Sequence, residues 1–162
     1  MRIRPATKKD TDPIWNIFRA VVSPGDTYAF DPAISRREAL AYWFQSGTWT
    51  YVVENKERVV GTYILRANQP GLGSHVANAA FMVSPQSRGM GLGRLMGEDC
   101  LEKARRLGFQ AMQFNFVVST NQAAIRLWKS LGFKIVATLP KAFRHSVKGF
   151  VDVHIMFRKL ID

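Results

Sequence analysis

The chain of 162 residues has 23 Lys and Arg against 12 Asp and Glu, a formal net charge of +11, and 47% hydrophobic residues. This composition is ordinary for one folded domain over residues 1–162, and no apolar run reaches the roughly 18 residues of a transmembrane helix. The N-terminus lacks the apolar region of a signal peptide, and a single cysteine excludes an internal disulfide. We therefore expect a cytoplasmic protein with no membrane partner.

The excess of positive charge raises the question of a nucleic-acid partner. The basic residues are scattered along the sequence, without a block of like charges or a known nucleic-acid-binding signature. We therefore expect no nucleic acid, and a small polyanionic ligand is the better match for a basic surface.

The first half of the chain predicts a strand, two helices and two further strands. Residues 2–6 form the strand, and Pro13 favours the first turn of a helix that ends at 23–26. After a loop at 27–32, Ser35 and Glu38 have capping-box spacing for a second helix that ends near Phe44. Alternating apolar residues then predict strands 49–54 and 59–65 around a hairpin turn.

The second half predicts four strands and two helices. A strand at 75–83 leads through a glycine-rich turn into a helix that Gly108 ends. A strand at 109–118, a helix at 121–131, a strand at 134–139, a loop at 140–149 and a strand at 150–157 follow. The whole predicts an α/β (α+β) domain: a mixed sheet of about seven strands with helices on both faces.

The glycine-rich turn is the first candidate site. Glycines at 89, 91 and 93 permit positive φ and let an anion approach the main chain. The helix start that follows leaves N–H groups unpaired and adds partial positive charge. The turn therefore predicts a phosphate or pyrophosphate site, although its spacing fits neither a P-loop nor the dinucleotide fingerprint.

Two motifs carry a family resemblance. The pattern Arg88-x-x-Gly91-x-Gly93 resembles the acetyl-CoA motif of the GNAT superfamily of N-acetyltransferases. Residues 121–133 resemble a second GNAT motif, Asn-x-x-Ala-x-x-Leu-Tyr-x-x-x-Gly-Phe, with Trp128 in place of Tyr. The predicted order of elements is also the GNAT order. In that fold the fourth and fifth strands splay apart around the pantetheine arm of the coenzyme.

The resemblance implies that acetyl-CoA is the co-substrate and assigns residues to it. Asn121 would bond the pantetheine, or act only as a helix N-cap, and Lys129 would lie near a phosphate. The main chain around Phe81, Met82 and Val83 would pair with the pantetheine, with one donor there polarising the thioester. The pyrophosphate would be bound by the main chain of Arg88, Gly89, Met90, Gly91, Leu92, Gly93 and Arg94, with the Arg88 side chain adding charge.

Trp128 departs from the family pattern. In many members a Tyr at this position is thought to protonate the leaving thiolate, whereas Trp offers only an N–H donor. Another group or water could do so, or the thiolate, with a pKa of about 8.5, could leave unassisted. The third alternative is a non-catalytic domain that binds or senses acetyl-CoA.

Two asparagines stand inside apolar strands that would flank the opening. An unpaired buried amide costs roughly 1–3 kcal/mol, and Asn is a poor strand former. We therefore predict that Asn78 and Asn115 face the site as catalytic or acceptor-binding residues; satisfied structural amides are the alternative. Candidates for the base are a chain of water molecules or one of His75, His145, His154, Asp26, Asp31 and Glu38.

The acceptor is predicted to be a small-molecule amine. Few acidic residues are present to bind a polycation, whereas Tyr28 and Phe30 in the loop before the second helix and His145 in the predicted 140–149 loop suit a small amino or imino acid. The segment 139–145 also resembles members that acetylate small cyclic imino acids. We expect no metal site, and a homodimer is left open.

Overall fold

The structure, a computed structural model, describes residues 1–161. Its elements follow the predicted order, with three short 3-10 turns in addition. Its strands and α-helices are β1 (Arg2–Pro5), α1 (Thr11–Val22), α2 (Arg36–Trp43), β2 (Thr48–Asn55), β3 (Arg58–Ala67), β4 (Val76–Val83), α3 (Leu92–Arg106), β5 (Ala111–Val118), α4 (Gln122–Ser130), β6 (Lys134–His145) and β7 (Gly149–Lys159). The prediction of a mixed seven-stranded sheet is confirmed.

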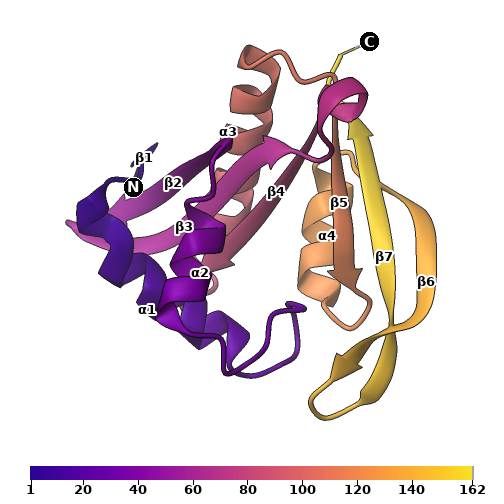
Figure 1. The fold of residues 1–162 in the computed structure, drawn as a ribbon, viewed down its shortest axis with the longest axis horizontal. Coiled ribbons are helices and arrows are strands. Elements are labelled where there is room, and N and C mark those ends of the chain that lie inside the picture. The colour runs from indigo at the N-terminus through magenta and orange to yellow at the C-terminus, as the bar shows by residue number, and fades with distance from the viewer. Residues whose placement is uncertain (162) are drawn as a thin grey trace.

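The sheet has the strand order β1-β2-β3-β4-β5-β7-β6 (Figure 1). Only the central pair, β4 and β5, is parallel, and its pairing is confined to Val76–Ala77 with Ala111–Met112. Beyond these residues the two strands diverge, as Figure 1 shows. Beyond Ala77, β4 therefore has main-chain groups that no neighbouring strand satisfies on its β5 side.

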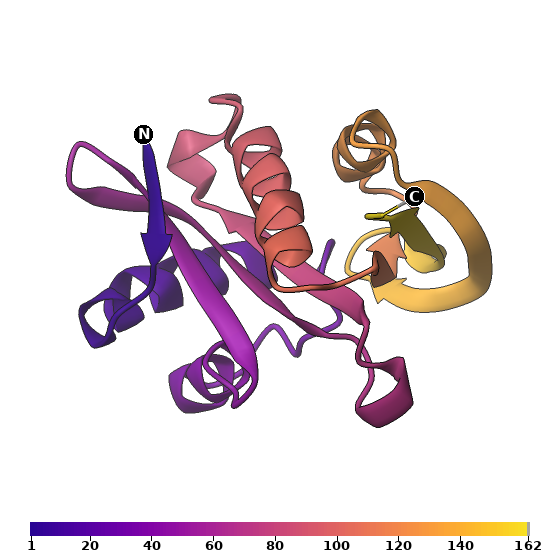
Figure 2. The same cartoon turned by 90° about the horizontal axis from the view of Figure 1, so that it is seen from above.

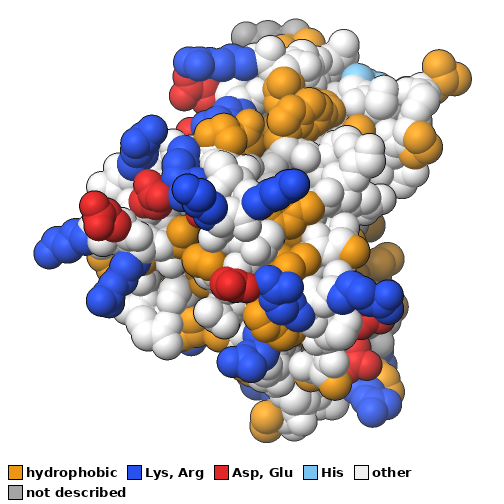
Figure 3. Space-filling model, turned by 60° about the vertical axis from the view of Figure 1, so that its left-hand side comes forward, with side chains coloured by type: hydrophobic (Ala, Val, Ile, Leu, Met, Phe, Trp, Pro, Cys, Tyr) orange, Lys and Arg blue, Asp and Glu red, His pale blue; other side chains and the backbone are white. Residues whose placement is uncertain are grey.

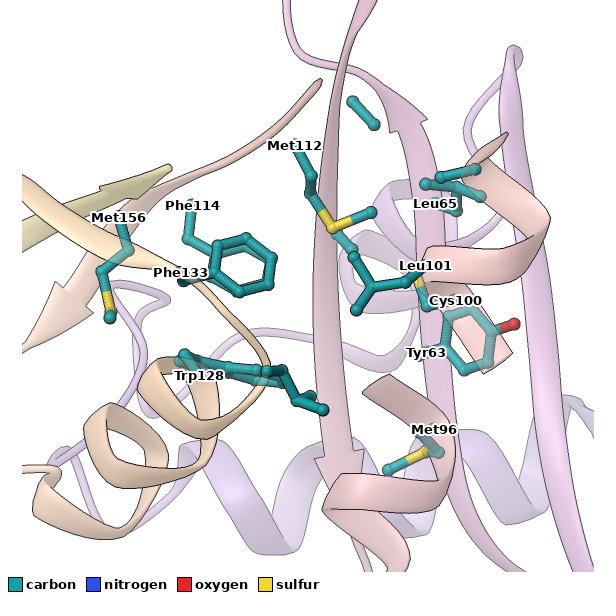
Figure 4. Packing of buried hydrophobic residues seen from close by; sticks show 14 of the residues in the cluster. Tyr63, Leu65, Met96, Cys100, Leu101, Met112, Phe114, Trp128, Phe133 and Met156 are labelled. Atoms are coloured by element: carbon teal, nitrogen blue, oxygen red, sulfur yellow. The ribbon is translucent and has the colours of Figure 1, made fainter. Parts of the chain in front are cut away.

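Helices cover both faces of the sheet: α1 and α2 lie on one face, and α3 and α4 on the other (Figure 2). On the α1–α2 face, Phe18 and Trp43 are fully buried, and their rings meet edge to face at 5.6 Å. On the other face, side chains of β3 to β5 pack against α3 and α4 (Figure 4). Both apolar layers include residues of β4, and the α3–α4 layer also includes residues of β5.

The prediction of a loop at 140–149 is wrong. Strand β6 continues to His145, and its pairing with β7 resumes at Phe143 after a register shift. Pro140 has no N–H to give to a ladder, and Lys141 adopts a φ of 52° in the bulge that follows. Beyond the bulge, Phe143 is buried with Val118 and Val153, which draws the strand back onto the sheet.

Positively charged side chains are dispersed over the surface. On the face shown in Figure 3, Lys and Arg side chains lie between acidic and apolar groups. None of the helices in residues 1–161 has the length and apolar character that crossing a bilayer requires.

Candidate functional site

A cavity of about 1040 Å³ opens where β4 and β5 diverge. Its wall is formed by these strands, by the glycine turn before α3, by α4 and by the loop 23–35 between α1 and α2. Fourteen of the predicted site residues line it: Tyr28, Phe30, Asn78, Phe81, Met82, Val83, Arg88, Gly89, Gly91, Leu92, Gly93, Arg94, Asn115 and Asn121.

Three predicted residues do not belong to this wall. Met90 and Lys129 are exposed beside it. His145 lies at the turn between β6 and β7, where its Nδ1 accepts the N–H groups of Val147 and Lys148 at 3.1 and 3.2 Å.

The glycine turn presents the start of α3 to the cavity. Gly89 and Gly91 have φ of 78° and 75°, and Gly91 is the N-cap of the helix. The first intrahelical bond runs from the N–H of Leu95 to the carbonyl of Gly91 at 3.1 Å. The N–H groups of Leu92, Gly93 and Arg94 therefore have no partner within the helix and can bind an anion.

Close packing between helices supports this turn. A Cβ on Gly93 would approach Leu127 to 2.9 Å, and a Cβ on Gly97 would approach Leu131 to 2.6 Å. Absence of side chains at both positions lets α3 and α4 approach each other. The glycine at 93 thus serves helix packing as well as the cavity wall.

Strand β4 presents polar main-chain groups to the cavity at Phe81. The hydroxyl of Tyr28 donates to the carbonyl of Phe81 at 2.5 Å and accepts its N–H at 3.2 Å. The ring of Phe81 lies on the opposite face, 4.9 Å from the ring of Trp128. Phe81 therefore joins the α3–α4 core to the polar edge of the opening.

Asn121 caps α4 and also lines the cavity, so the predicted N-cap is confirmed and the bond to pantetheine stays a prediction. Its Oδ1 accepts the N–H of Ala124 at 3.2 Å, which makes it the N-cap of α4. The residue also lines the cavity, so its amide nitrogen can donate to a ligand.

Trp128 closes the floor of the cavity as a packing residue. It is 8% exposed, and its ring lies 4.8 Å from the ring of Phe114 and close to Phe133 (Figure 4). No hydroxyl is available at this position.

A second opening, of about 470 Å³, shares four wall residues with the large cavity: Tyr42, Arg66, Asn78 and Asn115. Asn78 donates across the divergence to the carbonyl of Gln113 at 2.9 Å. Asn115 donates to Asn68 Oδ1 at 2.6 Å and accepts from Gln113 at 2.9 Å. The two predicted asparagines thus belong to one amide network that bridges β4 and β5.

Sequence reasoning missed Arg66. It stands opposite Asn78 in the β3–β4 register, so the two side chains share a face of the sheet. Its guanidinium donates to the Tyr42 hydroxyl at 2.5 Å and to Gln45 Oε1 at 3.1 Å, and lies 4.6 Å from the Tyr42 ring centre. A charged residue at the end of an apolar strand was the available signal.

Of the six side chains considered as bases, only Asp26 lines the cavity. Glu38 caps α2 by accepting from Ser35, which lowers the pKa of its carboxyl. His154 pairs with Thr138 at 2.9 Å on the β6–β7 hairpin. In residues 1–161, no group of three His, Cys, Asp or Glu side chains has metal-binding geometry.

These donors fit the acetyl-CoA that the sequence resemblance implies. Free N–H groups at the start of α3 suit a diphosphate, and the part of β4 beyond Ala77, which has no β5 partner, suits an arm that contains amides. Phe81, Phe114 and Trp128 supply an apolar floor beneath the opening.

Comparison with known proteins agrees with this geometry. Residues 14–133 match the Acetyltransferase (GNAT) family. N-acetyltransferase aca1 of Schizosaccharomyces pombe is 32% identical over 151 residues, which cover 83% of this chain and 72% of that protein. L-amino acid N-acyltransferase MnaT of Escherichia coli is 28% identical over 146 residues, with 87% and 84% covered.

Solved structures show the same fold. A GCN5-related N-acetyltransferase from Kribbella flavida is 42% identical with a TM-score of 0.93, covering 98% of this chain and 96% of that one. The yncA protein of Salmonella typhimurium, a putative acetyltransferase solved with its cofactor acetyl-CoA, is 27% identical with a TM-score of 0.89 and 100% and 95% covered.

Proposed function

The chain belongs to the GNAT family of acetyltransferases, and we propose that its acceptor is the amine of a small amino or imino acid. Acetyl-CoA is the acyl donor of this family. The finer assignment, to a small acceptor with a carboxylate, is supported by the polar groups that gather at the acceptor side of the divergence. The observation that carries it is that Arg66, Asn78 and Asn115 line the same opening.

Arg66 is suited to bind a carboxylate. Its guanidinium has five N–H donors in a planar fork, of which the bonds to Tyr42 and Gln45 use two. Stacking on Tyr42 fixes the plane of the fork and reduces the entropy lost on binding. A carboxylate anchored here would hold the neighbouring amine beside Asn78 and Asn115, at the mouth of the diverging strands.

The remaining residues would position the two reactants. The N–H groups at the start of α3 and the free edge of β4 would hold the coenzyme, which supplies an acyl group activated as a thioester. Tyr28, Phe30 and Tyr42 form an aromatic wall on the acceptor side, with ring centres of neighbours 6.0 and 4.9 Å apart. This wall excludes water, which would otherwise compete with the amine as nucleophile.

Printed names of relatives support the class of acceptor. MnaT is named an L-amino acid N-acyltransferase, and another relative, from Salmonella typhimurium, is named for L-methionine sulfoximine and L-methionine sulfone. Both names describe amino acids or their close analogues. The acceptors of this chain are proposed by analogy with them.

The test is release of free thiol from acetyl-CoA across matched acceptors. Small neutral amino and imino acids are each compared with their amides, which keep the amine and lose the carboxylate; polyamines and aminoglycosides complete the panel. We expect kcat/KM for the acids to exceed that for the amides by about 10- to 100-fold, the value of a hydrogen bond to a charged group. Equal values for acid and amide would contradict a carboxylate site.

Two substitutions locate the carboxylate site. Arg66→Gln should remove the preference for acids, whereas Arg37→Gln, at an exposed position of α2, should keep it. The competing function is a non-catalytic acetyl-CoA-binding domain, which the absence of a hydroxyl at Trp128 favours. Binding of acetyl-CoA without thiol release on any acceptor would establish that alternative.

A further inference from the structure

One hydroxyl in the cavity meets both main-chain polar groups of a single residue. Tyr28, in the loop 23–35, donates to the carbonyl of Phe81 at 2.5 Å and accepts the N–H of the same residue at 3.2 Å. These two residues are 53 positions apart in the sequence.

The contact occurs where strand pairing has ended. In an antiparallel pair, successive residues direct their main-chain groups alternately toward and away from the neighbouring strand. Phe81 stands opposite Tyr63 of β3 but gives its N–H and carbonyl to Tyr28, so both groups point away from β3. Since β5 leaves β4 after Ala77, they point into the cavity.

Tyr28 is held in place and keeps its proton. Its ring stacks on Phe30 at 6.0 Å and 27°. The loop is tied to the β6–β7 turn, where Ser146 donates through its hydroxyl to Pro24 and through its N–H to Gly25. Burial of the hydroxyl raises the pKa of Tyr28, so it is a neutral donor at physiological pH.

The family motif has a Tyr hydroxyl at the position that Trp128 occupies, and this chain lacks it. At Trp128 the side chain packs between Phe81 and Phe114 and offers no O–H group. Tyr28 is the phenol that touches the strand edge at which the thioester would be polarised. A hydroxyl is therefore present at the opening, but it comes from the opposite face of the sheet.

We propose that Tyr28 is a catalytic hydrogen-bond donor to the acyl oxygen of bound acetyl-CoA, acting together with the N–H of Phe81. The proposal rests on the acetyl-transfer function above. In that reaction a C–N bond to the amine forms and the C–S bond breaks. The amine loses a proton to solvent, and sulfur keeps the bonding electron pair and takes up a proton from solvent. Negative charge develops on the acyl oxygen, and two donors aimed at it lower the barrier.

The O–H group of Tyr28 can change its hydrogen-bond acceptor from Phe81 to the acyl oxygen. In the free protein it is given to the carbonyl of Phe81, while the oxygen lone pair accepts the N–H of Phe81. An acyl oxygen that takes the N–H of Phe81 would release this lone pair, and rotation about the C–O bond of the phenol would direct the O–H toward the new acceptor. The phenol itself stays protonated throughout.

The decisive variant is Tyr28→Phe, which removes the hydroxyl and keeps the ring that stacks on Phe30. Its matched control is Tyr63→Phe, which removes a buried hydroxyl that donates to Asp99 of α3. Removing one of two donors should lower kcat about 100-fold and leave the Kd for acetyl-CoA within about threefold. Tyr63→Phe should retain wild-type kcat.

Two measurements report on the contact without turnover. The infrared carbonyl band of isotopically labelled acetyl-CoA, bound without acceptor, should shift to lower frequency in the wild type and less in Tyr28→Phe. In the free protein, the amide proton of Phe81 should exchange with solvent at least tenfold faster in Tyr28→Phe. A carbonyl band and kcat equal to those of the wild type would overturn the proposal, as would a higher kcat, which would identify the hydroxyl as an obstruction.

The same experiments separate this proposal from the function on which it rests. If calorimetry detects no binding of acetyl-CoA to the wild type, the acetyl-transfer function fails, and the role of Tyr28 fails with it. If the wild type binds acetyl-CoA and acetylates an acceptor while Tyr28→Phe behaves identically, only the role of Tyr28 is overturned.

Discussion

The hydroxyl of Ser146 donates a 2.7 Å hydrogen bond to the carbonyl of Pro24, across 122 positions of sequence. The N–H of Ser146 also donates to the carbonyl of Gly25 at 3.0 Å. These bonds fasten the β6–β7 turn to the loop that carries Tyr28 and Phe30. The loop that lines the acceptor side of the cavity is thus held by a turn from the other end of the chain.

We predict that Ser146→Ala loosens this loop and impairs catalysis more than folding. Loss of one exposed hydrogen bond should cost about 1 kcal/mol or less in unfolding free energy. The KM for acceptor should rise severalfold, because Tyr28 and Phe30 spend less time in place. Ser74→Ala, which changes an exposed serine outside both openings, is the control. Both variants are compared with the wild type by steady-state kinetics and thermal melts. Equal KM values in the two variants would show that the hydrogen bond between Ser146 and the loop has no role in acceptor binding.

The glycine turn gives a second prediction. Gly91 has a φ of 75° with nothing within 4 Å of a built Cβ, so Gly91→Ala adds strain without a clash in the free protein. Gly108→Ala is its matched control, since Gly108 has a φ of 86° and equally open surroundings. Each variant should lose about 1 kcal/mol of stability.

Only Gly91→Ala should weaken coenzyme binding, by tenfold or more in Kd, because its methyl group intrudes where an anion approaches the start of α3. Titration calorimetry with coenzyme A measures both variants. A Kd that changes by the same factor in Gly91→Ala and Gly108→Ala would place the diphosphate elsewhere.

The amide network gives a third prediction, for the acceptor. Asn115 is exposed to the cavity, so Asn115→Ala should raise the acceptor KM about tenfold while the melting temperature and the Kd for coenzyme A stay near wild type. Asn78→Ala should impair turnover and also lower stability, because Asn78 ties β4 to Gln113 across the divergence. The exposed amide Gln110 serves as control. Unchanged turnover and acceptor affinity in both variants would assign the two asparagines a structural role.

The fourth prediction concerns pH and lies outside the site. Arg4 makes a bidentate pair with Asp10, whose side chain is 5% exposed, and these hydrogen bonds lower the pKa of Asp10 to about 2. A depressed carboxyl pKa stabilises the folded state above the unfolded value of 3.8, and this contribution is lost as pH falls from there toward 2. At neutral pH it amounts to about 2 kcal/mol.

Urea unfolding of Asp10→Asn across pH 2 to 7 tests this. The difference from wild type should be largest at neutral pH and should shrink below about pH 3. Asp12→Asn, which removes a 78% exposed partner of Arg36, should change stability by less than about 1 kcal/mol at any pH. A deficit in Asp10→Asn that persists undiminished at pH 2 would mean that charge is not its cause.

Local patterns decided much of this structure. The capping box at Ser35 and Glu38, the glycine stops and the helical and strand periodicities predicted every strand and helix in order, because such signals act between residues that are near in sequence. The wrong prediction of a loop at 140–149 has the same origin, because Pro140 is a local signal that favours a loop. Contacts of Phe143 with Val118 and Val153 and renewed pairing with β7 return that segment to the sheet.

The sequence alone determined the glycine turn and the helix start at α3, whose unpaired main-chain donors are expected to form an anion site wherever they fold. Tertiary structure decided what faces it. Short pairing between β4 and β5 opens the cavity, the β3–β4 register brings Arg66 beside Asn78, and the loop 23–35 brings Tyr28 to the edge of Phe81. These are contacts between residues remote in sequence, which depend on the packing of the whole sheet and leave no periodic trace in the chain.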